Sequence, residues 1–157
     1  MSAAEDPLAD DITEWVFSTG EALKLTAVTR QQIDYWGRTR ILPDHLAWGR
    51  GSGNHLRWRF ADLVATDLIA RLSGVCGLDS SLFRDQKFHV NLAVAQAMYG
   101  WDLAVVIDQT GPSITPAFDL VCELHRRDAN LATVAMVGPL AESIARNARS
   151  LRAEATL

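Results

Sequence analysis

Two short segments near the start of the chain carry apolar residues at helical spacing, and each follows a cap. Ser18 precedes the first, with Glu21 in its first turn, which is typical of a helix start. Thr29 precedes the second, and Gln32 follows three residues later, as a capping box requires. The spacing turns Val28, Ile33 and Trp36 inward and leaves Arg30, Gln31, Asp34, Tyr35 and Arg38 outside. Two short helices joined by a tight turn predict a helix-turn-helix.

The next segment changes from helical spacing to alternation. Pro43 ends the second helix, and a loop rich in glycine and arginine spans residues 48–55. Residues 56–60 alternate apolar and cationic side chains, which predicts a strand with one solvated face. With the glycine loop as a hairpin tip, this strand forms a wing, and a long helix is expected over residues 61–73. The glycines match neither the P-loop nor the dinucleotide-binding pattern, so nucleotide binding is disfavoured.

After residue 78 the chain resumes helical spacing, with Asp79 or Ser80 as the cap and Gly100 as the end. The apolar stripe of this expected helix consists of Leu82, Phe88, Leu92, Ala95, Met98 and Tyr99. A stripe of this kind suits either a partner-facing seam in a dimer or packing on its own domain.

The last third of the chain predicts a small α+β unit. Its elements are a buried strand over residues 103–107, a brief strand over 114–116, a helix to about Arg127, a strand over 131–137 and a final helix through Leu151. The predicted fold class is therefore mainly α with small β elements. We expect a flexible N-terminal tail (1–17), a winged helix-turn-helix domain (18–77), and a dimer helix with a small α+β C-terminal domain (78–157).

Composition places the chain among ordinary globular proteins, and its charge is unevenly distributed. The 157 residues are 48% hydrophobic and 22% charged, with a formal net charge of −4, which by itself points away from nucleic acid. Between Thr29 and Arg59, however, the chain has six arginines and only two acidic residues. The formal net charge of this segment is therefore +4, and that of the remaining residues is −8. Arginine is the cation best suited to bidentate contacts with phosphate and guanine. The charge distribution therefore favours DNA as a partner.

The chain offers little material for catalysis, metal binding or export. Its acidic N-terminus is no signal peptide, no apolar stretch approaches a bilayer span, and two cysteines make no disulfide framework, so we expect a cytoplasmic protein. Cys122 and His125 have ligand-like spacing, but the apolar residues around them favour a buried thiol. No histidine stands beside a recognisable nucleophile or carboxylate pair. We expect no enzyme activity, cofactor or metal, and whether an aromatic pocket of Tyr99, Trp101 and Phe118 binds an effector stays open.

Residues 18–78 resemble the DNA-binding domain of the MerR family of transcriptional regulators, most closely the actinobacterial type with a small mixed C-terminal domain. The resemblance rests on three stretches in unbroken order: residues 20–29 (GEALKLTAVT), 33–43 (IDYWGRTRILP) and 51–63, which contains WRFADL. It implies a homodimer that binds a palindromic operator with two winged helix-turn-helix units, and it leaves a contact with RNA polymerase open. Ala27 replaces the family's usual turn glycine, and Leu56-Arg57-Trp58 departs from its wing pattern.

Carried over residue by residue, the resemblance implies a DNA-binding set in two groups. The second helix supplies Thr29, Arg30, Gln31 and Gln32 for base edges, with Tyr35 and Arg38 for the backbone. The wing supplies Arg50, Asn54, His55, Arg57 and Arg59 for the flanking backbone or minor groove. Each residue also has a simpler structural role available: Trp36 and Trp58 suit the core, and Arg38 and Arg40 suit the end of a helix.

The function expected is a sequence-specific, DNA-binding transcriptional regulator that acts as a homodimer. Two alternatives stay open. One is an architectural DNA-binding protein such as a recombination directionality factor, against which the substantial C-terminal half argues. The other is a protein-interaction module that uses the winged domain without DNA.

Overall fold

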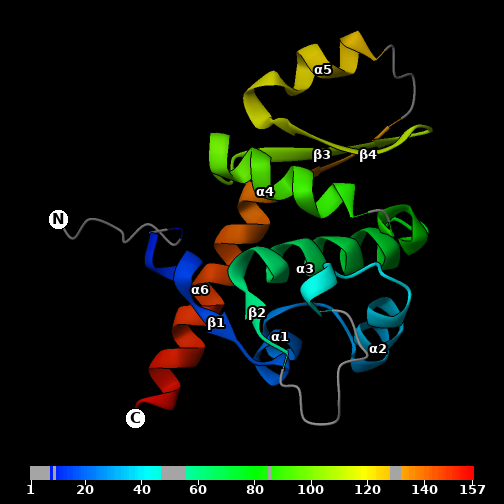
Figure 1. Cartoon of the computed structure of the whole chain (residues 1–157). Helices are drawn as coiled ribbons and strands as arrows, with labels where there is room; N and C mark the ends of the chain where they lie inside the picture. The colour runs from blue at the N-terminus through cyan, green and yellow to red at the C-terminus, as the bar shows by residue number, and fades with distance from the viewer. Residues whose placement is uncertain (1–7, 9, 47–55, 85, 128–131) are drawn as a thin grey trace, which may run out of the picture.

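The N-terminal half is built from short elements around one long helix, and the C-terminal half from a small sheet between helices (Figure 1). The computed structural model describes residues 8, 10–46, 56–84, 86–127 and 132–157. The helices are α1 (Thr19–Leu25), α2 (Arg30–Arg38), α3 (Phe60–Gly74), α4 (Lys87–Tyr99), α5 (Leu120–Arg126) and α6 (Val137–Ala155). The strands are β1 (Val16–Phe17), β2 (Trp58–Arg59), β3 (Leu103–Asp108), β4 (Gly111–Pro116) and β5 (Thr133–Met136). The described chain is mainly helical with two small antiparallel sheets, as predicted.

Both predicted helix starts are confirmed at the level of individual hydrogen bonds. Ser18 Oγ accepts from the Glu21 amide at 3.2 Å, and the Glu21 carboxylate accepts from the Ser18 amide at 2.7 Å. Thr29 Oγ1 accepts from the Gln32 amide at 3.2 Å, and Gln32 Oε1 accepts from the Thr29 amide at 2.8 Å. These reciprocal bonds satisfy amide groups that a helix leaves unpaired in its first turn.

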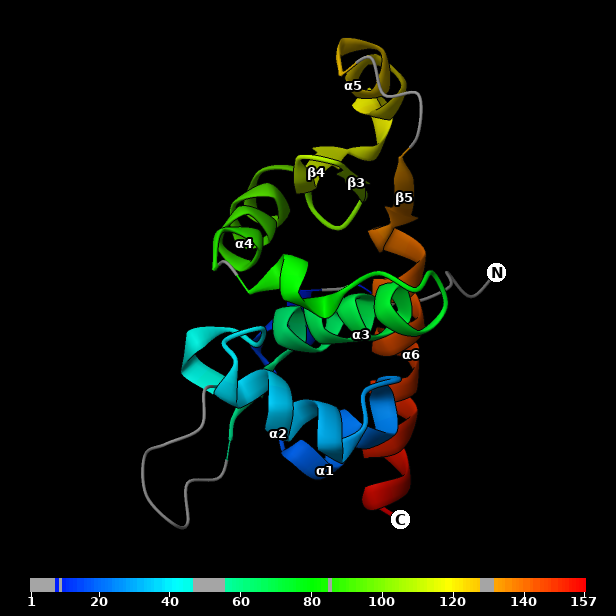
Figure 2. The same ribbon diagram turned by 90° about the vertical axis from the view of Figure 1, so that its right-hand side faces the viewer.

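Helix α3 lies at the centre of the molecule and is buried along most of its length. Buried apolar residues from both halves form one continuous core around it, from Ile12 near the start to Ala148 in α6. Helix α6 returns from the C-terminal sheet to pack against α3 and α1 (Figures 1 and 2). Two views at right angles agree that α1 and α2 lie at the opposite end of the molecule from α5.

The larger sheet has the order β4-β3-β5 and is wholly antiparallel. Helices α4 and α5 lie on its opposite faces (Figure 1). Residues 103–107 of the central strand are buried, because a strand covers each edge and a helix each face. The β-branched run predicted as a buried strand is therefore confirmed.

The smaller sheet joins β1 to β2, with Phe17 opposite Trp58. Within the segment predicted as a flexible tail, residues 10–17 form a 3-10 turn (Asp10–Glu14) and β1, and they bury Ile12 and Phe17. Helix α6 holds residues 10–17 (the N-terminal arm) against the core through Arg152. The Arg152 guanidinium lies 4.2 Å from the Trp15 ring centroid and donates to Val16 O at 2.7 Å.

Several expected boundaries were wrong. The strand expected over residues 56–60 is only Trp58–Arg59, because Phe60 already opens α3. Its partner in the described chain is β1, and the loop of the expected hairpin (48–55) lies outside the described residues. The helix expected from residue 78 is a separate 3-10 turn (Ser80–Phe83), capped by Asp79, and α4 begins only at Lys87. A further 3-10 turn (Ala117–Asp119) separates β4 from α5.

No helix in the described part of the chain combines the length and the apolar character needed to cross a bilayer.

Candidate nucleic-acid interface

The outer face of α2 presents several polar side chains with unused hydrogen-bonding capacity. Arg30 and Gln31 are exposed in its first turn, while Ile33 and Trp36 are buried on the opposite side. Within the described residues, the Arg30 side chain has no hydrogen bond or ion pair. One turn further along, Tyr35 is 48% exposed, and Arg38 is exposed with Nε donating to its own helix at Asp34 O over 3.3 Å. This face of α2 offers donors to a ligand without first breaking an internal ion pair.

Thr29 and Gln32 are arranged differently from the other residues predicted to read bases. Their capping box engages the Thr29 Oγ1 lone pair and the Gln32 Oε1 atom, and the Gln32 side chain is half-buried. The Thr29 hydroxyl hydrogen and the Gln32 amide nitrogen are left for other contacts. Among the four residues, Arg30 and Gln31 are therefore the best placed to contact a base edge.

The turn before α2 is held against α3 by a buried carboxylate, Asp67, which no sequence pattern singled out. Asp67 is fully buried; its Oδ1 accepts from the Ala27 amide at 2.6 Å and its Oδ2 from Arg71 Nε at 2.9 Å. Ala27 does not have positive φ, which explains why alanine is accepted where the MerR pattern usually has glycine. Asp67 thus fixes the start of α2 relative to the central helix.

The described cations of the expected wing lie beside the start of α3. Arg57 is exposed and has no ion pair within the described chain, whereas the Arg59 guanidinium lies 3.4 Å from the Asp62 carboxylate and stays 63% exposed. Trp58, between them, is fully buried and donates from Nε1 to Thr19 Oγ1 at 3.2 Å. Trp58 is thus a core residue, and the two arginines flank it. The other expected wing residues, Arg50, Asn54 and His55, lie outside the described residues.

Asp62 is a second buried carboxylate that sequence reasoning missed. It accepts from the Arg59 amide at 2.8 Å and lies 2.7 Å from His45 Nε2. Burial raises its pKa, but hydrogen bonds from His45 and the Arg59 amide outweigh burial and hold the pKa below its ordinary value. The sequence contains only a weak indication of this role. Asp62 stands three residues after Arg59, which is the spacing of a capping box, but the first residue is not the usual Ser or Thr.

The apolar face of α4 differs from the predicted stripe. Phe88 and Leu92 are buried in the protein's own core, so they cannot meet a partner. The exposed apolar residues include Val90 (58% exposed) and Val94 (53%), which the stripe omitted, and Met98 (65%) and Tyr99 (43%), which it included. Burial of Phe88 and Leu92 fits the alternative that the stripe packs on its own domain. Spacing did not identify the exposed positions, because apolar residues surround much of α4.

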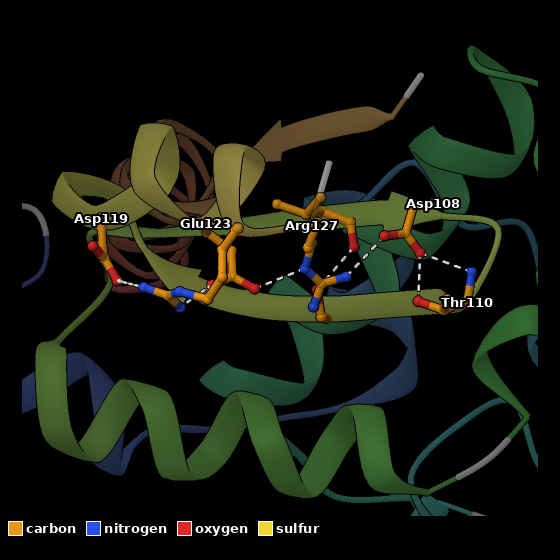
Figure 3. Close-up of polar contacts among 8 residues, drawn as sticks. Asp108, Thr110, Asp119, Glu123 and Arg127 are labelled. Atoms are coloured by element: carbon orange, nitrogen blue, oxygen red, sulfur yellow. Dashed lines mark hydrogen bonds and ion pairs between the residues drawn. The ribbon is translucent and has the colours of Figure 1, made fainter. Parts of the chain in front are cut away.

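Cys122 is not the buried thiol expected. It is exposed, because α5 buries none of its residues fully, and Cys76 is exposed as well. In the described part of the chain, no three His, Cys, Asp or Glu side chains are grouped as a metal would require. The end of α5 instead carries ion pairs (Figure 3): Arg127, which caps α5, bridges Asp108 of β3 at 2.9 Å and Glu123 of α5 at 2.7 Å. Hydrogen bonds from Thr110 and the Arg127 guanidinium hold the pKa of Asp108 below its ordinary value. These ion pairs attach the end of α5 to β3.

Within the described residues, the three aromatic side chains considered for an effector pocket do not all line the pocket that contains Trp101. Tyr99 and Phe118 are exposed and contact each other with ring centroids 6.1 Å apart. Trp101 is buried and packs edge-on against Phe60 at 5.4 Å. A pocket between α3 and α4 includes Trp101 but neither of the other two rings, and its volume of about 50 Å³ is far below the roughly 300–1,000 Å³ of drug-sized ligand sites.

Comparison of the chain with models of known protein families, with curated proteins and with solved structures finds no match.

Proposed function

We propose that this protein is a sequence-specific, DNA-binding transcriptional regulator of the MerR type that acts as a homodimer on a palindromic operator. The observation that carries the proposal is the first turn of α2, where Arg30 and Gln31 stand exposed and unpaired within the described chain. Asp67 anchors the preceding turn, so these side chains project from a fixed position. In this proposal α1 and α2 form the helix-turn-helix, α2 enters the major groove, and β2 belongs to the wing.

Contacts divide between base reading and positioning. Arg30 pairs with guanine O6 and N7, and Gln31 with adenine N6 and N7, the geometries for which these side chains are suited. Tyr35, Arg38, Arg57 and Arg59 contact phosphates, which fixes the register of α2 on the duplex. Six arginine–phosphate contacts per dimer predict that log K falls with log salt at a slope of about −5. The remainder of the protein, at −8, weakens binding to DNA that lacks the right bases.

The exposed face of α4 supports the homodimer. Val90, Val94 and Met98 are four residues apart and form one strip, and no charged residue lies between Lys87 and Asp102. An antiparallel pair of α4 helices, with the two-fold axis at Val94, sets Val90 against Met98 of the second copy. Lys87 then approaches Asp102 of that copy, which adds charge complementarity. An interface of this kind uses the same surface on both copies.

The test is a binding experiment with DNA from upstream of the protein's own gene, followed by footprinting. We expect protection of an inverted repeat. Arg30→Ala removes one bidentate base contact from each half-site of the dimer and should therefore weaken binding roughly 5- to 150-fold for each half-site. Arg146→Ala is the matched control, because Arg146 is an exposed arginine on α6 without an ion pair in the described chain. Binding that ignores sequence would contradict the proposal and favour an architectural protein, whose gene is expected beside an integrase.

The interaction-module alternative is separated by a cell-based readout. If the winged unit serves only to bind another protein, Arg30→Ala and Arg57→Ala leave function unchanged. In our proposal both variants lose regulation of a reporter placed behind the protected repeat. Transcription in vitro with RNA polymerase then determines whether the bound protein activates or represses.

A further inference from the structure

The backbone of residues 40–44, which follow α2, is bound by the side chain of the residue that caps the start of α4. Gln86 immediately precedes α4, and its amide group meets three main-chain groups of residues 40–44. Its Nε2 donates to Arg40 O at 2.9 Å and to Leu42 O at 3.1 Å, while its Oε1 accepts from the Asp44 amide at 3.1 Å. The side-chain amide has two donors and one acceptor atom, and all of them are used. Gln86 thus binds the backbone of every second residue, Arg40, Leu42 and Asp44, as a neighbouring strand does at the edge of a sheet.

One turn further along α4, His89 adds a fourth bond to the same segment. His89 Nε2 lies 2.8 Å from Ile41 O, and because a carbonyl oxygen only accepts, Nε2 carries the hydrogen. Burial holds the pKa of His89 below its ordinary value, so the ring is neutral and bonds through that single tautomer. Gln86 and His89 are three residues apart and therefore face the same way.

The bound segment is continuous with the last turn of α2. The amides of Ile41 and Leu42 both donate to Trp36 O, at 3.0 and 3.3 Å. Arg40, at φ 62°, makes the reversal between α2 and this segment. A displacement of α4 is therefore transmitted through these hydrogen bonds to α2 itself.

We propose that Gln86, with His89, is a clamp that fixes α2 relative to α4 and thereby determines which separation of operator half-sites the dimer accepts. This inference rests on the proposed function, in which α4 pairs with the second copy and α2 reads the DNA. The distance between the two α2 helices of the dimer is then determined by the clamp in each subunit and by the contact between the two α4 helices. One added base pair moves a half-site by about 3.4 Å and turns it by about 35°, so a rigid clamp discriminates among spacers.

The experiment measures the affinity of the full-length protein for operators that keep both half-sites and differ by single base pairs in the spacer. We expect the unchanged protein to prefer one spacer over its neighbours at least tenfold. Gln86→Ala should reduce that preference below about threefold while binding to an isolated half-site stays within twofold. Gln96→Ala is the control, since Gln96 lies on the same helix and its side chain makes no hydrogen bond within the described chain.

Two further readouts separate a clamp from a general loss of structure. Amide exchange at Asp44 should rise in Gln86→Ala while exchange within α3 stays unchanged. Gln86→Glu, which keeps the acceptor but lacks both donors, should behave like Gln86→Ala and gives the same comparison should the alanine variant not fold.

An unchanged spacer preference in the Gln86 variants would overturn the clamp, as would an equal loss of affinity for every spacer and for the isolated half-site. A protein that shows no sequence-specific binding before any substitution overturns the proposed function first, and the clamp with it.

Discussion

Replacement of Asp67 tests whether the turn before α2 depends on one buried carboxylate. Asp67 is fully buried in α3 and joins two elements: the Ala27 amide at 2.6 Å, forty residues earlier, and Arg71 at 2.9 Å on its own helix. Asp67→Ala removes both contacts. Asp67→Asn keeps an oxygen for the Ala27 amide and removes the charge.

The two contacts differ in their contribution to stability. A hydrogen bond from a backbone amide to a carboxylate contributes about 1.5–3 kcal/mol, because the amide is left without a partner when the oxygen is removed. The Arg71 side chain is 56% exposed, so its ion pair, screened by solvent, contributes at most about 1 kcal/mol. We therefore expect Asp67→Ala to lower the free energy of unfolding by about 2–3 kcal/mol and the melting temperature by about 5–10 °C.

Urea unfolding of the full chain measures this difference, with Arg71→Ala as the control that removes only the ion pair. The slope against urea should be the same in all variants, so that the midpoints report stability. We expect Arg71→Ala to cost less than about 1 kcal/mol and Asp67→Asn to fall between the two. If Asp67→Ala is no more destabilising than Arg71→Ala, the bond to Ala27 does not hold the turn and the reasoning is wrong.

Three further predictions follow from single features of the molecule. Arg40→Gly should stabilise the protein by about 0.5–1 kcal/mol in thermal or urea unfolding, because glycine relieves a positive φ and only an exposed ion pair to Asp44 is lost; a destabilised variant would contradict this. Asp62 has a lowered pKa in the folded protein, so its stabilising contribution is complete above the ordinary carboxyl pKa of about 3.9 and is lost as the pH falls through the lower folded value. The difference in unfolding free energy between the unchanged protein and Asp62→Asn should accordingly shrink from pH 5 to pH 3, and a constant difference would argue against the shift. Val94→Cys, at the proposed two-fold axis, should give a disulfide-linked dimer on mild oxidation, whereas Asn91→Cys on the same helix should give much less; a monomer at micromolar concentration by sedimentation would contradict the α4 pairing.

Local signals predicted the parts of the fold that local chemistry determines. The helix start at Ser18 and the capping box at Thr29 formed as expected, because a capping side chain and an acid or amide three residues later are both local in sequence. The buried strand 103–107 was equally readable from its β-branched residues. The inward positions of Ile33 and Trp36 followed from helical period alone.

The polar residues that hold these pieces together could not be predicted. Asp67 reaches a backbone amide forty residues away, and Gln86 reaches backbone groups more than forty residues away. Because nearly every residue carries the same backbone groups, a hydrogen bond from a side chain to the backbone leaves no mark on the identity of its partner residue in the sequence. The exposed and buried positions of α4 and α5 were also mispredicted. Apolar residues in a helix do not by themselves reveal which face meets the core, and here that depends on the sheet between the two helices.

The contact between α6 and the N-terminal arm limits how early the protein can finish folding during its synthesis. Arg152 covers Trp15 and Phe17, and Phe17 in turn pairs with Trp58 through the small sheet. Helix α6 is translated after every other described element, yet it packs on α1 and α3 and secures the first strand. Contacts between sequence-distant segments form late and slow folding. A nascent chain that has released α1, α2 and α3 from the ribosome therefore still lacks one wall of its core, and a protein interrupted before residue 137 would carry the exposed arginines of α2 on an incomplete core.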